Sequence, residues 1–222
     1  MENSNILAFS GSPRRSGNSA ILLDRFLKGA AENGAVNEII YPHQLNIKPC
    51  TGCLRCNILK RCSQREDDWS VLSEKILAAE VLVFAAPVYF HHLPAPLKMI
   101  IDRFRSFIHV RITETGLIHT PWQEWKKQFV LILTMGSSDD SDANPVVDLF
   151  RFMTSILGPE NELHLVKATR LAMAGQLTRS TEELKVLYDK MKLSPHLAER
   201  DHSRNSQLLA SVKQLGFSLT KK

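Results

Sequence analysis

Residues 6–19 read ILAFSGSPRRSGNS, and this stretch decides the fold class of the 222-residue chain. The apolar run at 6–9 predicts a short buried strand, and the Ser- and Gly-rich residues that follow predict a tight turn. From Asn18 the apolar residues repeat with a helical period, at Ile21, Leu22, Phe26, Leu27 and Ala30. Asn33-Gly34 ends this helix, since Gly is favoured just after a helix C-terminus. A strand that turns tightly into a helix begins a βαβ unit, which indicates an α/β fold.

The same alternation of strand and helix continues through most of the chain. Four further strands are predicted, at residues 36–41, 81–86, 129–134 and 163–168. Helical patterns lie between them, one capped by Asp67 or Asp68, one after Pro94, and one from Pro145 to Leu157. Strands that alternate with helices predict a doubly wound parallel sheet with helices on both faces.

Composition excludes several classes of protein. The formal net charge is +5, but no basic stripe with interleaved aromatic residues is present, so we expect no nucleic-acid partner. No apolar run approaches the length of a membrane span, and the N-terminus does not have the pattern of a signal peptide. We therefore expect a cytoplasmic protein that does not bind membranes.

The turn after the first strand is suited to binding a phosphate. A loop that enters a helix presents free backbone N–H groups and the positive end of the helix dipole. Arg14 adds positive charge to this loop. Its hydroxyl and amide side chains add hydrogen-bond donors, and they belong to Ser10, Ser12, Ser16, Asn18 and Ser19. The residue after Gly17 is Asn18 and not Lys, and no G-x-G-x-x-G is present, so neither a triphosphate loop nor a dinucleotide fingerprint fits. A terminal monophosphate, as in FMN, fits better; the alternative is an ordinary turn that caps a helix.

Two motifs together resemble the NADPH-dependent FMN reductases, which have a flavodoxin-like fold. The first is residues 10–19, and the second is Pro87-Val88-Tyr89-Phe90 with the later Pro96-Leu97-Lys98 and Ile101-Asp102-Arg103. The resemblance covers about residues 5–177 and implies a five-stranded sheet of order 2-1-3-4-5 that binds FMN and takes electrons from NAD(P)H. The cofactor-binding residues that we expect are Ser10, Ser12, Pro13, Arg14, Gly17, Asn18, Ser19, Pro87, Val88, Tyr89, Phe90, Met135, Gly136 and Ser137. We name no catalytic residue, because the flavin itself carries hydride chemistry.

All four cysteines fall in one short segment. Cys50, Cys53, Cys56 and Cys62 form a C-x₂-C-x₂-C-x₅-C pattern. Four thiolates at such spacing meet the needs of an iron–sulfur cluster, and the neighbouring Lys and Arg residues favour deprotonated thiols. The spacing is also similar to that of the iron–sulfur flavoproteins, which implies a [4Fe–4S] cluster that passes electrons to FMN. Structural zinc, and thiols that hold no metal, are the alternatives.

These features lead to one preferred function and two alternatives. We expect an NAD(P)H-dependent oxidoreductase that passes electrons to a flavin, quinone or other small acceptor. A relay between protein partners such as ferredoxin, and a redox-inactive phosphate binder, are the alternatives. We expect a flavodoxin-like domain over residues 1–177 with an inserted cysteine segment at 48–63, followed by a helical extension over 178–222. The resemblance implies a homodimer or homotetramer, and Trp122 and Trp125 are expected to be exposed.

Overall fold

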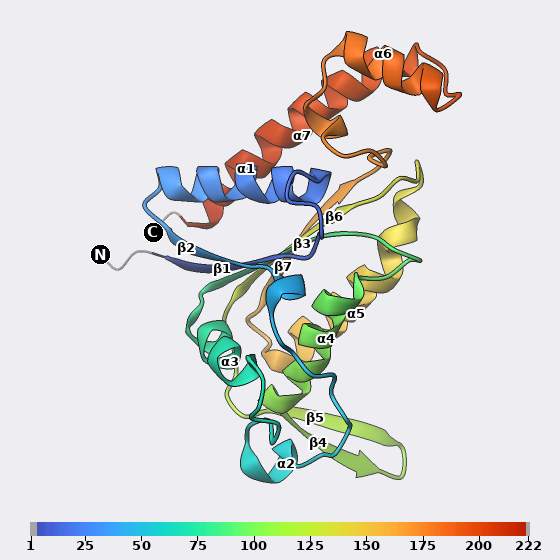
Figure 1. The fold of residues 1–222 in the computed structure, drawn as a ribbon. Coiled ribbons are helices and arrows are strands. Elements are labelled where there is room, and N and C mark those ends of the chain that lie inside the picture. The colour runs from blue at the N-terminus through green and yellow to red at the C-terminus, as the bar shows by residue number, and fades with distance from the viewer. Residues whose placement is uncertain (1–3, 221–222) are drawn as a thin grey trace.

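A parallel five-stranded sheet forms the centre of the protein in a computed structural model that describes residues 4–220 (Figure 1). The strands of this sheet are β1 (Asn5–Ser10), β2 (Val36–Ile40), β3 (Val81–Pro87), β6 (Gln128–Thr134) and β7 (Glu162–Ala168). Their order across the sheet is β2-β1-β3-β6-β7, and every neighbouring pair is parallel. The predicted order 2-1-3-4-5 is therefore confirmed, with β6 and β7 as the fourth and fifth parallel strands.

Helices cover both faces of the sheet (Figure 1). One face carries α1 (Asn18–Glu32) and α7 (Leu197–Leu219), and the other carries α3 (Trp69–Ala78), α4 (Ala95–Arg103) and α5 (Asn144–Leu157). The short α2 (Cys56–Leu59) lies within the cysteine segment, and α6 (Thr181–Lys190) precedes α7. Among residues 4–220, no helix is both long enough and apolar enough to cross a bilayer.

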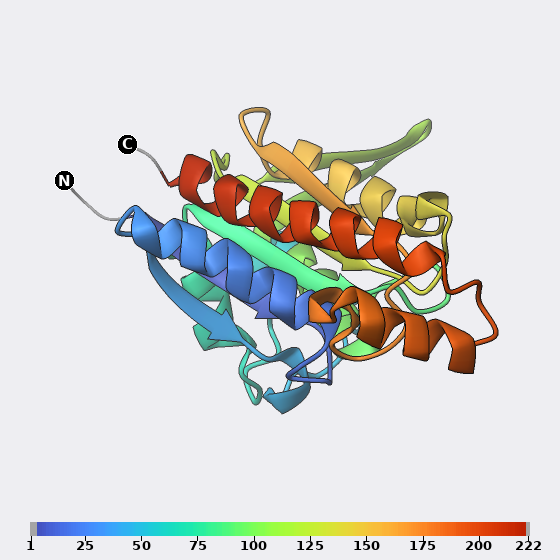
Figure 2. The same ribbon diagram turned by 90° about the horizontal axis from the view of Figure 1, so that it is seen from above.

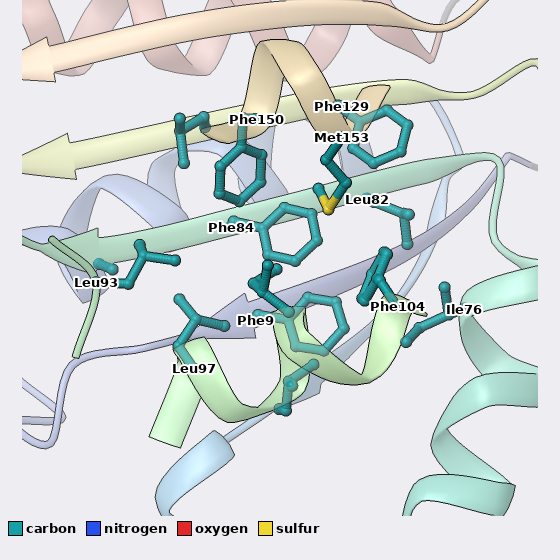
Figure 3. Packing of buried hydrophobic residues seen from close by; sticks show 14 of the residues in the cluster. Phe9, Ile76, Leu82, Phe84, Leu93, Leu97, Phe104, Phe129, Phe150 and Met153 are labelled. Carbon is teal, nitrogen blue, oxygen red and sulfur yellow. The ribbon is translucent and has the colours of Figure 1, made fainter. Parts of the chain in front are cut away.

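Alternating residues of the central strands fill two separate cores. In β3, Leu82 and Phe84 face α3, α4 and α5, whereas Val81 and Val83 face α1 and α7. Figure 3 shows the first of these cores, in which the ring of Phe84 stacks on that of Phe9 at 4.8 Å. Because both faces of these strands are buried, the strands are apolar at nearly every position. This continuous apolar pattern allowed them to be predicted from the sequence.

The last helix, α7, packs along α1 (Figure 2). Two glycines allow the two backbones to approach closely: a Cβ on Gly29 would overlap the Lys213 carbonyl, and one on Gly216 would overlap the Phe26 carbonyl. Val212 is 1% exposed in the core that α7 shares with α1. The segment after residue 177 thus supplies one of the two helices that cover this face of the sheet.

An antiparallel hairpin that the sequence patterns did not predict lies between α4 and β6. It consists of β4 (Ile108–Thr113) and β5 (Gly116–Pro121), and it forms a separate two-stranded sheet. Its side chains are mostly exposed or half-buried, so it lacks the apolar run that marks a buried strand. The expectation that Trp125 is exposed is wrong, because this side chain is 4% exposed and packs between Phe107 and Phe129 in the core.

Candidate functional site

A cavity of about 130 Å³ lies where the parallel strands end. Loops that follow β1, β3, β6 and β7 form its walls, which is the usual position of a ligand site in a doubly wound sheet. It is lined by Ser12, Arg14, Gly17, Asn18, Ser19, Pro87, Val88, Tyr89, Thr134, Met135, Gly136, Leu171, Ala172 and Ala174. Ten of the fourteen predicted cofactor-binding residues line it; Ser10, Pro13, Phe90 and Ser137 do not.

The loop after β1 presents an uncapped helix N-terminus to this cavity. Gly17 occupies the N-cap position of α1, and no side chain caps the helix. The first N–H groups of α1 therefore lack partners within the helix. The Ser12 hydroxyl and the Arg14 backbone hydrogen-bond each other, which fixes the turn that leads into the helix. Free N–H groups, a helix dipole and the Arg14 cation together favour an anion here.

Asn18 connects α1 to a loop that the sequence did not indicate. Its amide nitrogen donates to the carbonyls of Leu171 (3.0 Å) and Met173 (2.8 Å), and its amide oxygen accepts from the N–H of Leu177 (3.1 Å). Residues of this loop, which follows β7, form the fourth wall of the cavity. The buried Asn18 amide is thus occupied with backbone groups of the protein, and no periodicity in 169–178 could have revealed that wall.

The loop after β3 makes a tight turn at the mouth of the cavity. Tyr89 and His92 exchange two backbone hydrogen bonds of 2.9 Å, and the two residues between them, Phe90 and His91, have φ of 48° and 59°. Tyr89 lines the cavity, but the Phe90 side chain is fully exposed. Both residues were expected to bind the cofactor, but only Tyr89 lines the cavity.

The loop after β6 forms another wall of the cavity. Met135 is buried, and a Cβ added to Gly136 would lie 3.3 Å from the Ala172 Cβ. The carbonyl of Ser137 accepts a hydrogen bond of 2.8 Å from the backbone N–H of Arg170. Ser137 therefore supports the fourth wall through its backbone instead of facing the cavity.

The four cysteines line a second cavity, of about 200 Å³, next to the C-terminal end of α4. Cys50 and Cys53 are exposed, Cys62 is half-buried and Cys56 is buried. A hydrogen bond from the Ser63 hydroxyl, with further ones from the segment itself, lowers the pKa of the Cys53 thiol to about 7. Burial raises the pKa of Cys56, although Arg105 Nη1 lies 3.5 Å from its sulfur. Within residues 4–220, no set of His, Cys, Asp and Glu side chains is arranged closely enough to hold a single metal ion.

A buried ion pair holds the two ends of the cysteine segment. Arg103, at the end of α4, donates to the Lys48 carbonyl at 2.8 Å and to the Asp67 carboxylate, and both side chains are inaccessible to solvent. Asp67 in turn accepts from the N–H of Lys48 and of Trp69. The two ends of the cysteine segment are therefore held together by this ion pair. Arg103 also lines the cavity that the four cysteines line.

The sequence model of the NADPH-dependent FMN reductase family matches residues 4–166. This range includes the loops after β1, β3 and β6, which line the cavity. This chain belongs to that family. An iron-sulfur flavoprotein of Methanocaldococcus jannaschii is 35% identical over 100 residues, which are 45% of this chain and 51% of that protein. The chain thus matches about half the length of this curated relative.

Solved structures with the same fold match nearly the whole chain. An NAD(P)H:quinone oxidoreductase from Methanothermobacter marburgensis superposes with a TM-score of 0.64 at 17% identity, covering 99% of this chain and 98% of that one. An FMN-dependent NADH-azoreductase from Bacillus anthracis, solved in complex with FMN, superposes with a TM-score of 0.63 at 16% identity, covering 99% and 100%. These likenesses establish the flavodoxin-like fold of the reductase family for this chain.

Proposed function

We propose that the protein is an FMN-dependent oxidoreductase that takes electrons from NAD(P)H and passes them to a flavin, quinone or other small acceptor. The observation that carries the proposal is the uncapped N-terminus of α1, which faces the polar cavity between the strand-end loops. Family membership and the FMN-dependent enzymes among its relatives and structural neighbours support it.

The residues present fit the cofactor. The N–H groups at the start of α1, with Ser12, Arg14 and Ser19, would hold the phosphate. Tyr89 and the loop after β6 would flank the ring, and the absence of a side chain at Gly136 lets this loop pack closely against Ala172. Bound FMN would accept a hydride from the nicotinamide and pass the electrons on. The protein would orient the ring and limit its access to water.

Flavin titration and rapid mixing test the proposal. FMN added to the apoprotein should be bound at one site per chain and should raise the melting temperature, since a ligand that binds only the folded state stabilises it. Mixing the FMN complex with NADPH or NADH should then bleach the flavin absorbance. FMN that leaves the calorimetric heat and the melting temperature unchanged would refute the binding site. Bound flavin that neither nucleotide bleaches would refute the oxidoreductase.

We further propose that the four cysteines hold an iron–sulfur cluster. All four line one cavity that two arginines, Arg103 and Arg105, also line, and cationic surroundings favour thiolates. Such a cluster would make a relay to a ferredoxin-like protein the second candidate function. Iron and acid-labile sulfide measured on anaerobically purified protein test the cluster. Bleaching of the flavin by reduced ferredoxin but not by NAD(P)H would favour the relay over the enzyme.

We propose, finally, that the active protein is a cytoplasmic homodimer or homotetramer. We also propose that residues 178–222 are an extension of a domain spanning 1–177, and that this extension packs back on the domain through α7. Size-exclusion chromatography with light scattering tests the oligomeric state. A monomer at all concentrations would refute it.

A further inference from the structure

The fourth wall of the flavin cavity lies outside the part of the chain that the family description matches. That match ends at residue 166, whereas Leu171, Ala172 and Ala174 line the cavity. These residues belong to an irregular loop between β7 and α6, so their position depends on contacts from elsewhere. The contacts show which part of the chain holds this wall.

A buried polar network connects the loop to the last two helices. Arg170 forms two hydrogen bonds with the Asp201 carboxylate, from Nε at 3.0 Å and from Nη2 at 2.7 Å. Tyr188 donates its hydroxyl to the same carboxylate at 2.7 Å. Gln176 donates to the Arg170 carbonyl at 2.7 Å and lies 3.3 Å from the Tyr188 hydroxyl. Asp201 and Tyr188 are completely buried, although they lie on different helices, α7 and α6.

Arg170 links this network to the backbone of the loop after β7. Its φ is 54°, in the left-handed region that residues with a side chain seldom adopt. Its N–H bonds to the Ser137 carbonyl, and the next residue, Leu171, bonds through its N–H to the Met135 carbonyl at 2.8 Å. The bend at Arg170 therefore sets Leu171 and Ala172 against the loop after β6. The bidentate bond to the buried Asp201 carboxylate holds the arginine side chain, while Ser137 and Gln176 bond to its backbone.

We propose that Asp201 is a positioning residue of the flavin site: through Arg170 it holds the Leu171–Ala174 wall against the loop after β6. The inference rests on the proposed FMN function. It gives α7, which also covers the sheet, and α6, which packs on α7 beyond the sheet, a role in holding the site. Burial opposes ionisation of Asp201, but the bonds from Arg170 and Tyr188 outweigh this effect and keep the pKa of the carboxyl below its usual value. The carboxylate is therefore charged at neutral pH, as the bidentate contact requires.

Asp201→Asn tests this assignment, because it retains the shape of the side chain and removes its charge. We expect the Kd for FMN to rise at least tenfold, and the visible circular dichroism of the bound flavin to change. If Asp201→Asn does not fold, Tyr188→Phe is the alternative test, because it removes only one hydroxyl from the network. It should raise the Kd for FMN by a smaller factor. In an Arg170→Met background, Asp201→Asn should add little further loss, since residues of one network are not additive.

The matched control is Val212→Ala, a buried residue of α7 that packs on α1 and makes none of these contacts. It should lower the melting temperature of the apoprotein yet leave the Kd for FMN within about twofold. Wild-type affinity in Asp201→Asn, or an equal loss of affinity in Val212→Ala, would overturn the assignment. If the wild-type protein itself does not bind FMN, the proposed function fails instead, and the two failures are thus distinguishable.

Discussion

Replacing Arg103 with Met tests how the cysteine segment is anchored. Asp67 would keep its contacts with the N–H groups of Lys48 and Trp69, but its buried carboxylate would lose the cation that neutralises it. Removing one partner of a buried ion pair costs about 3–5 kcal/mol. In a chain of this size, each kcal/mol lowers the melting temperature by about 2–4 °C, so we expect a fall of roughly 6–20 °C. Thermal unfolding and urea denaturation of the apoprotein measure this loss.

A second substitution separates the charge from the shape. In the Arg103→Met background, Asp67→Asn removes the unpaired charge and should restore about 1–3 kcal/mol, since an uncompensated buried charge is what destabilises the single variant. Trypsin should also cleave the cysteine segment at Arg55 or Lys60 faster in the single variant than in the double variant. A single variant that loses less than about 1 kcal/mol, or a double variant less stable than the single, would refute the reasoning.

The stability that the Arg103–Asp67 ion pair contributes should depend on pH. Burial disfavours the charged form of Asp67, but the bonds from Arg103 and from two backbone N–H groups outweigh burial and lower the pKa of its carboxyl from its usual value. A carboxyl whose pKa is lowered in the folded state stabilises the protein above its unfolded pKa, and this stabilisation is lost as the pH falls toward the folded value. The wild-type protein should therefore keep the contribution of this pair at neutral pH and lose it only below about pH 4.

Three further outcomes follow from single positions. Gly29→Ala should destabilise the protein by about 2 kcal/mol or more in urea denaturation, because the new methyl overlaps the Lys213 carbonyl of α7; wild-type stability would contradict that packing. Burial lowers the pKa of Lys127 to about 8 in the folded protein. The free energy of unfolding of the wild type, compared with that of Lys127→Met, should therefore rise between about pH 8 and 10.5, by at most about 3 kcal/mol. A difference that stays constant with pH would contradict the burial of Lys127. Gly136→Val should raise the Kd for FMN at least tenfold and Gly136→Ala should raise it less, because the larger side chain would push Ala172 away from the loop after β6 and so displace one wall of the cavity. Equal affinities would place the flavin elsewhere.

Strands with both faces buried were predictable because burial leaves a continuous apolar run. The segment Val81–Ala86 is such a run, and it pairs on both sides in the centre of the sheet. The turn after β1 was equally predictable, since its Ser, Gly and Pro residues directly join a strand to a helix. In both cases the pattern and the structure it produces lie within a few neighbouring residues.

What the sequence did not reveal depends on contacts between distant residues. Asn18 was expected to face a phosphate, but its amide bonds to a loop about 150 residues away. The hairpin β4–β5 has few buried side chains and so carries no strong periodicity. Arg103 was recognised only as part of a motif, and nothing near it in the sequence identifies Asp67 as its partner. Local patterns describe elements, whereas these loops are fixed by single polar contacts across the fold.

Two buried carboxylates perform the same physical task at separate loops. Asp67 bonds to Arg103 at the base of the cysteine segment, and Asp201 bonds to Arg170 beside the cavity at the strand ends. The pairs lie with helices on opposite faces of the sheet (Figure 1), so we expect them to act independently. Combining Arg103→Met with Asp201→Asn should therefore add their losses of stability to within about 0.5 kcal/mol. Only Asp201→Asn should weaken FMN binding, and only Arg103→Met should speed cleavage of the cysteine segment. A larger coupling energy, or either effect crossing to the other site, would mean that one network extends through the sheet and connects the cysteines to the flavin.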